Sequence, residues 1–271
     1  MAHLVAAVLA PFRTLIVHRK VIGTFVRRDI RGRYVNSVLG LAWAVIQPLS
    51  LLVLYTFVFS VVLGIRLGRD TSTTGFAFYL FCGMLPWLAF AEGLTRSTSA
   101  IVDHAHLIKK VVFPSEILPA YVVASALVTE LIALGIFVVV ASVFYQPPGW
   151  TLLGLPVVIA FQVMLTLGLG WFLASLNVFL RDIGQGLGLA LTLWMLLTPI
   201  FYPPDMVPPR FRWVLGWNPL HYLVQAYRDV LLDHRLPALS HLVALGTIAV
   251  AAFLAGSWFF RRSKNAFIDV I

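Results

Sequence analysis

Residues 117–181 read ILPAYVVASALVTELIALGIFVVVASVFYQPPGWTLLGLPVVIAFQVMLTLGLGWFLASLNVFLR, and Glu130 is the one charged side chain before Arg181. A helix that crosses a bilayer needs about 20 apolar residues, so this stretch is long enough for two. Its QPPG segment, residues 146–149, has the composition of a turn. The stretch therefore predicts two consecutive membrane-spanning helices joined by a short turn.

Four more runs without Lys, Arg, Asp or Glu flank this stretch: Tyr34 to Ile65, Thr71 to Ala91, Ile183 to Pro204 and Leu236 to Phe260. The 271 residues are 60% hydrophobic and only 11% charged, with a mean hydropathy of +0.92. A soluble domain cannot bury so much apolar surface. We therefore expect an all-α, polytopic membrane protein with six transmembrane helices, at about 37–64, 74–94, 117–143, 151–176, 183–203 and 237–260.

The basic residues indicate the orientation. Most of the 20 Lys and Arg side chains precede helix 1, lie between helices 2 and 3 or 4 and 5, or follow helix 6. Positive loops stay in the cytoplasm, so an arm over residues 1–36 and a tail over 261–271 are predicted to be cytoplasmic. This asymmetry and contact with anionic lipid account for the net charge of +9 without a nucleic-acid partner. The other face would carry Arg66, Arg69, Arg210, Arg212, Arg228 and Arg235.

The N-terminal arm contains an amphipathic segment between His18 and Tyr34. Its apolar residues follow helical spacing: Val21, Ile22, Phe25, Val26 and Ile30. Such a helix is expected to lie on the inner leaflet. Two roles remain open: a topology anchor, or a gate for lateral entry of a lipid-linked substrate whose anionic head group would contact Arg28, Arg31 and Arg33.

Two loops contain segments too polar to span. Residues 97–110 predict a short cytoplasmic helix ending at Lys109 and Lys110, and residues 205–235 predict two short amphipathic pieces on the outside. Asn218 is suited to cap a helix that has Pro219 at its first position. We expect a re-entrant pair whose junction, Gly216, Trp217, Asn218 and Pro219, is a candidate outer gate. The alternative is a pair of helices lying flat on the outer surface.

Glu130 is the intramembrane acid. It must be protonated, paired or facing water, and we favour a structural polar contact because no spanning run contains a base. Glu92 is expected to meet Arg96 one turn further on. Asp103, His104 and His106 do not complete a metal site, and no catalytic constellation, metal site or cofactor is expected.

Aromatic side chains are abundant, with 8 Trp, 8 Tyr and 20 Phe. Most would serve interfacial belts or helix packing. A sugar-conducting path would also use ring faces, and its weak candidates are Trp43, Tyr55, Phe59, Trp87, Trp171, Trp194 and Tyr202. Pro48, Pro86 and Pro199 are expected to kink helices 1, 2 and 5.

Five segments occur in an order that resembles one family: RDIRGRYVNSVLGLAWAVIQP (28–48), HLIKKVVFPSEILP (106–119), NVFLRDIGQ (177–185), TPIFYP (198–203) and WNPLHYLVQAYRD (217–229). They are similar to the permease subunits of bacterial ABC transporters that export capsule, O-antigen or teichoic acid. The capsule exporters resemble the chain most in length and in the sequence of these segments. The resemblance implies an inner-membrane homodimer enclosing a channel for a lipid-linked polysaccharide. A periplasmic co-polymerase and an outer-membrane exporter are further partners that it allows.

The resemblance also implies two ATPase subunits beneath the permease. The loop between helices 2 and 3 would form the coupling helix, and the candidate contacts are Asp103, His106, Leu107, Lys109, Lys110, Arg181 and Asp182. The alternative for Lys109 and Lys110 is a role in topology alone. None of the 19 glycines is followed by lysine, so the chain lacks a phosphate-binding loop, and ATP and Mg²⁺ would be bound by the partner. Other hypotheses are a permease for drugs, lipids or haem, and an ion-coupled carrier that Glu130→Gln would inactivate.

Overall fold

The computed structural model describes residues 13–34, 42–62, 64, 72–110, 114–147 and 149–270. Within these ranges the chain is helical, with turns and no strand. The predicted start of helix 1 at 37–41, the loop with Arg66 and Arg69, and Pro148 lie outside the described residues, as do the side chains of Pro48, Phe59 and Lys110. The helices run as follows: α2 Arg19–Tyr34, α3 Trp43–Thr56, the π-helical η2 Phe57–Val62, α4 Thr73–Asp103, α5 Ala105–Lys110, α6 Ile117–Phe144, η3 Trp150–Gly154, α7 Leu155–Phe179, α8 Asp182–Leu197, η4 Pro204–Met206, η5 Pro209–Phe211, α9 Trp213–Trp217, α10 Pro219–Leu231 and α11 Leu239–Val270.

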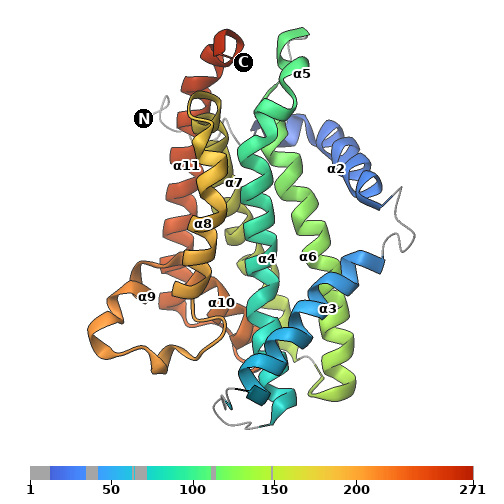
Figure 1. Ribbon diagram of the computed structural model, residues 1–271, viewed down its shortest axis with the longest axis vertical. Coiled ribbons are helices and arrows are strands. Elements are labelled where there is room, and N and C mark those ends of the chain that lie inside the picture. The colour runs from blue at the N-terminus through green and yellow to red at the C-terminus, as the bar shows by residue number, and fades with distance from the viewer. Residues whose placement is uncertain are drawn as a thin grey trace.

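Within the part of the chain that the structure describes, four helices are long and apolar enough to cross a bilayer: Thr73–Asp103, Ile117–Phe144, Trp150–Phe179 and Leu239–Ala266. They confirm a multi-pass membrane protein at the predicted positions of helices 2, 3, 4 and 6. Two shorter apolar helices, Leu49–Val62 and Asp182–Leu197, occupy the positions predicted for helices 1 and 5, so the count of six remains a prediction. Figure 1 shows the long helices side by side, with α5, the α7–α8 turn and the C-terminus at one end and α9 and α10 toward the other.

Helices α7 and α11 approach most closely where two glycines meet. A Cβ added to Gly256 would lie 1.9 Å from the carbonyl oxygen of Gly168. A Cβ added to Gly168 would lie 2.4 Å from the backbone of Ala252. Only the absence of side chains lets the two backbones touch here, as is common where membrane helices pack.

Apolar contacts hold α2 against the helix bundle. The rings of Phe25 and Tyr121 lie 5.2 Å apart, and Ile22 and Val26 pack on the same apolar cluster. The predicted stripe is thus directed at α6, while Arg27, Arg28 and Arg31 are exposed on the other face. The arm therefore packs against protein rather than resting on lipid alone.

Three helix ends differ from the prediction. Helix α4 continues without a break to Asp103, so a separate helix over 97–110 is wrong and only Ala105–Lys110 is distinct. The polar segment stays helical because Thr98 bonds back to the Leu94 carbonyl and Ser97 to the Pro119 carbonyl. Helix α8 ends at Leu197, not 203, since Thr198 is extended before Pro199. Pro199 therefore lies beyond the helix that it was expected to kink.

The third difference concerns the C-terminal tail. Helix α11 continues past Phe260 to Val270 instead of ending near residue 260. Lys264 in this extension forms a 2.8 Å ion pair with Glu116 at the start of α6, and Phe267 is fully buried. These contacts explain why a charged segment keeps the helical conformation.

Candidate functional site

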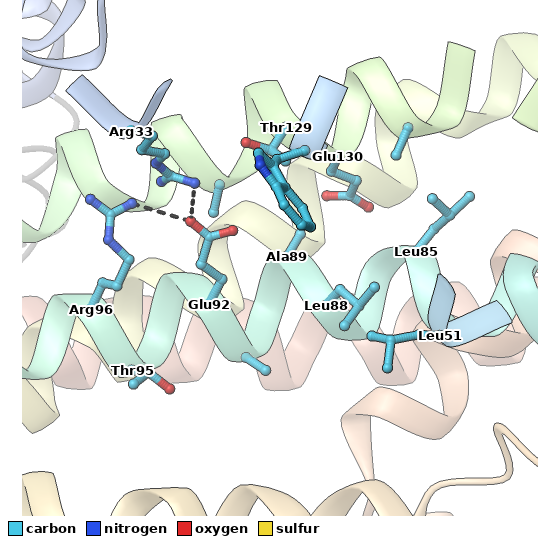
Figure 2. A pocket seen from close by; sticks show the side chains of 14 residues that line it. Arg33, Leu51, Leu85, Leu88, Ala89, Glu92, Thr95, Arg96, Thr129 and Glu130 are labelled. Atoms are coloured by element: carbon cyan, nitrogen blue, oxygen red, sulfur yellow. Dashed lines mark hydrogen bonds and ion pairs between the residues drawn. The ribbon is translucent and has the colours of Figure 1, made fainter. Parts of the chain in front are cut away.

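A cavity of about 540 Å³ lies between α3, α4 and α6. Arg33, Glu92 and Arg96 line it at the end near α2, and Leu51 and Leu85 line its apolar part. Figure 2 shows Glu130 pointing into it from α6, beyond the charged cluster. The cavity thus joins a charged mouth to an apolar interior that contains one carboxyl group.

Four side chains, which we call the mouth cluster, form the charged end: Asp29, Arg33, Glu92 and Arg96. The carboxylate of Asp29 pairs with Arg33 at 3.0 Å and with Arg96 at 2.5 Å. Glu92 pairs with Arg33 at 2.5 Å and Arg96 at 3.2 Å. The last contact is the predicted i, i+4 pair, which is confirmed, whereas the pairs across α2 and α4 were not foreseen. They turn Arg33 toward the bundle and leave Arg28 and Arg31 facing outward.

Glu130 belongs to a buried ring of three polar side chains, which we call the carboxyl ring. The Gln162 amide nitrogen lies 2.7 Å from one Glu130 oxygen, and the Tyr227 hydroxyl lies 2.7 Å from the other. The same hydroxyl lies 2.7 Å from the Gln162 amide oxygen. These contacts confirm the structural polar role favoured for Glu130, and they join α6, α7 and α10.

Helix α10 is buried along one apolar stripe. Leu220, Leu223, Val224 and Tyr227 are fully buried, and Leu231 is 6% exposed. Asn218 caps the helix, accepting a 3.0 Å bond from the Leu220 amide, with Pro219 at the first position. The expected cap is therefore confirmed, and α10 packs inside the protein, against α4, α7 and α11.

Asn218, the cap of α10, and Arg228 within α10 contact the C-terminal end of α8 and the residues that follow it. Trp194 donates to the Asn218 side chain, which in turn donates to Thr198, both at 2.9 Å. Arg228 donates to the carbonyls of Pro199 and Ile200 at 2.7 and 2.8 Å. We call these four contacts the outer clamp.

Arg228 was counted among the charges of the face opposite the N-terminal arm, and its burial in the protein was not predicted. It is 2% exposed and stacks on the Tyr79 ring at 3.5 Å. Asp229, the next residue in the sequence, forms an ion pair with Arg235 at 2.6 Å and not with Arg228. That hydrogen bond raises the pKa of Arg235 above its ordinary value. The helical spacing of α10 places position 228 inward, a signal that was available in the sequence but that its charge concealed.

The cytoplasmic candidates lie at one end of the molecule (Figure 1). Asp103, His106 and Lys109 are exposed at the α4–α5 corner, while Leu107 packs against the core cluster beneath. Arg181 and Asp182 are exposed in the α7–α8 turn. Among the described residues, no group of three metal-binding side chains occurs.

The aromatic candidates divide by burial. Trp87 and Trp171 are 4% and 1% exposed, and the indole of Trp171 donates to the Glu116 carbonyl at 3.0 Å. These two side chains are packed in the core of the chain. Trp43 lines the cavity and is 45% exposed. Tyr55, Trp194 and Tyr202 are half-buried. At the outer junction, Gly216 and Trp217 are exposed, and Asn218 and Pro219 are buried.

Comparison with known proteins agrees with this architecture. The chain is 31% identical over 261 residues to the O-antigen export system permease protein RfbA of Myxococcus xanthus, covering 96% of this chain and 98% of the relative. It is 29% identical to a protein of the same name from Klebsiella pneumoniae, covering 90% and 92%. It is 21% identical to the polysialic acid transport protein KpsM of Escherichia coli, covering 89% and 92%. Of these three, the two O-antigen export permeases are the more similar.

The family comparison covers most of the chain. Residues 20–232 match the family described as ABC-2 type transporter. The matched range runs from α2 through α10 and so includes the mouth cluster, the carboxyl ring and the outer clamp. This chain belongs to the ABC-2 type transporter family, whose members are membrane transport proteins.

Proposed function

We propose that the chain is the membrane-spanning subunit of an ATP-driven exporter for a lipid-linked cell-surface polysaccharide, capsular or related. The observation that carries this proposal is similarity along nearly the whole chain to permeases named for polysaccharide export. The subunit would reside in the bacterial inner membrane with both termini in the cytoplasm, and ATP would be hydrolysed by a separate subunit. Drug, lipid or haem export and ion-coupled transport are not favoured by any relative found.

The ATPase would bind the α4–α5 corner and the α7–α8 turn. Asp103, His106 and Lys109 present exposed polar groups there, and the half-buried Leu107 would transmit displacement into the core. Arg181 and Asp182 add a second contact at the same end. Lys110 stays part of this proposal through its place in α5.

The channel would form between two copies of the chain. Helix α8 buries only Leu187 and Leu191 against its own protomer, and Leu189, Leu193 and Leu196 are more than half exposed. Such a helix is available for a partner copy. Trp43, Tyr55, Phe59, Trp194 and Tyr202 remain the proposed channel-lining rings. The junction of α9 and α10 is the proposed outer gate, and we retain the re-entrant interpretation because α10 is buried in protein.

The arm α2 would contact the lipid anchor of the substrate. Arg28 and Arg31 are exposed and offer guanidinium groups to an anionic head group. Arg33, also a candidate, is already paired with Asp29 and Glu92. We therefore assign head-group attraction to the first two and positioning of α2 to Arg33.

Coupling is tested by reversing one charge. Lys109→Glu should lower both the amount of ATPase that co-purifies with the permease and substrate-dependent ATP hydrolysis in proteoliposomes. Arg262→Glu is the matched control, because Arg262 is also exposed but belongs to α11, and neither the α4–α5 corner nor the α7–α8 turn includes it. Equal behaviour of the two variants would refute the assignment.

The substrate class is tested in cells. Deletion of the gene should leave polysaccharide on the inner membrane and remove it from the cell surface. Surface polysaccharide that persists, with loss of drug or haem efflux instead, would refute the proposed function.

A further inference from the structure

The number of hydrogens that the carboxyl ring needs for its hydrogen bonds determines whether Glu130 is protonated. Its three contacts, each 2.7 Å, need three hydrogens. Tyr227 supplies one, and the Gln162 amide supplies one toward the ring. The third must come from Glu130. Exchanging the oxygen and nitrogen of Gln162 does not change this result, because the amide oxygen would then face a Glu130 oxygen and still need a hydrogen between them.

The surroundings give an independent argument for the same state. Glu130 is 3% exposed, and among the described residues no cation contacts it. Arg228 is the nearest arginine in α10, but its guanidinium is directed at the Pro199 and Ile200 carbonyls. An ionised carboxylate buried without a cation would cost several kcal/mol. A neutral carboxyl group avoids that cost.

The other titratable groups near the ring do not change this balance. Cys82 on α4 and Tyr227 on α10 cannot supply a positive charge, because a thiol and a phenol are never cations. Arg33 and Arg96 lie along the cavity but are paired with Asp29 and Glu92. Both described cations that line the cavity, Arg33 and Arg96, therefore already have a partner other than Glu130.

We propose that Glu130 carries its proton at neutral pH and acts as a positioning residue, closing the carboxyl ring so that α10 is held against α6 and α7. Through the outer clamp, α10 in turn fixes the outer end of α8. This inference goes beyond the proposed export function, and it holds for any substrate. It also assigns Glu130 no part in carrying ions.

The decisive variant is Glu130→Gln. A glutamine can donate its amide hydrogen to the Tyr227 hydroxyl and accept from Gln162, so it preserves all three contacts without a titratable group. Export and ATP hydrolysis by the full transporter, and the Tm of the permease, should stay at the wild-type level. The pH profile of ATP hydrolysis should also be unchanged. Loss of activity in Glu130→Gln would overturn the proposal, whether through misfolding or through lost transport.

Two further measurements separate the protonation from the positioning. Infrared spectra of the purified transporter at neutral pH should contain a protonated-carboxyl C=O stretch that disappears in Glu130→Gln, and its absence from the wild type would overturn the assigned proton. Glu130→Ala leaves Tyr227 and Gln162 without a buried partner, which should lower the folded population roughly tenfold. Glu130→Ala with unchanged Tm and export would show that the ring positions nothing.

Discussion

Replacement of Gly256 by alanine tests the glycine contact between α7 and α11. The new Cβ would lie 1.9 Å from the Gly168 oxygen, whereas ordinary contacts begin near 3.4 Å. The helices would have to separate by about 1.5 Å. The obstructing atom belongs to the backbone of α7, so no side-chain rotation can relieve the overlap.

The magnitude follows from two opposing effects. Overpacking costs about 1–3 kcal/mol, and the rigid obstruction places Gly256→Ala at the upper end, about 3 kcal/mol. Alanine recovers about 1 kcal/mol of helix propensity. The net loss of stability is therefore about 2 kcal/mol. Gly135 provides the control, because a Cβ added there meets nothing within 4 Å, and Gly135→Ala should be stabilising by about 1 kcal/mol.

The assay is thermal unfolding of both purified variants in the same detergent, followed by tryptophan fluorescence. A difference of about 3 kcal/mol corresponds to Tm values about 6–12 °C apart, at about 2–4 °C per kcal/mol. Gly168→Ala should behave like Gly256→Ala, since its Cβ would meet the Ala252 backbone. Equal Tm values for Gly256→Ala and Gly135→Ala would refute the contact between α7 and α11.

Two further substitutions test the outer clamp and the dimer. Arg228→Lys keeps the charge but can serve only one carbonyl well, so it should lose about 2 kcal/mol of stability. Arg235→Lys is the control: its side chain is exposed and a lysine can still pair with Asp229, so it should change stability by less than about 1 kcal/mol. Equal losses by thermal unfolding would contradict the buried clamp. Leu193→Cys should form disulfide-linked dimers in membranes under mild oxidation, because Leu193 is exposed on the face of α8 proposed to meet the partner copy. The native Cys82 is buried and should not cross-link. Val139→Cys, on the exposed face of α6, should not, and cross-linking of both or neither variant would argue against a dimer through α8.

The apolar helices were predictable because a segment that crosses a bilayer must be long and apolar. Such a segment appears in the sequence as an uninterrupted run of apolar residues. Local polar features were predictable for a related reason. The Glu92–Arg96 pair and the Asn218 cap depend on residues within one helical turn. Each could be found from spacing alone.

Contacts between distant segments could not be found in this way. Glu130 and Tyr227 are 97 positions apart, and nothing local distinguishes this tyrosine from the other seven. The position where α4 ends was predicted wrongly for a similar reason. Arg96 resembles a membrane boundary in sequence, but Asp29 of another helix neutralises it, so the helix continues. The burial of Arg228 was not predicted because its partners are backbone carbonyls, which every residue possesses.

The unbroken course of α4 has a mechanical consequence. Its 31 residues span about 46 Å, compared with about 30 Å for the hydrocarbon interior of a bilayer. A tilt of about 5° moves one end of such a rod by about 4 Å relative to the other. A displacement of the short segment beyond His104 would therefore move the Ser72 end of α4, on the opposite side of the membrane. Within α4, Pro86 is the one position whose backbone cannot donate a hydrogen bond, so it is where the helix can bend.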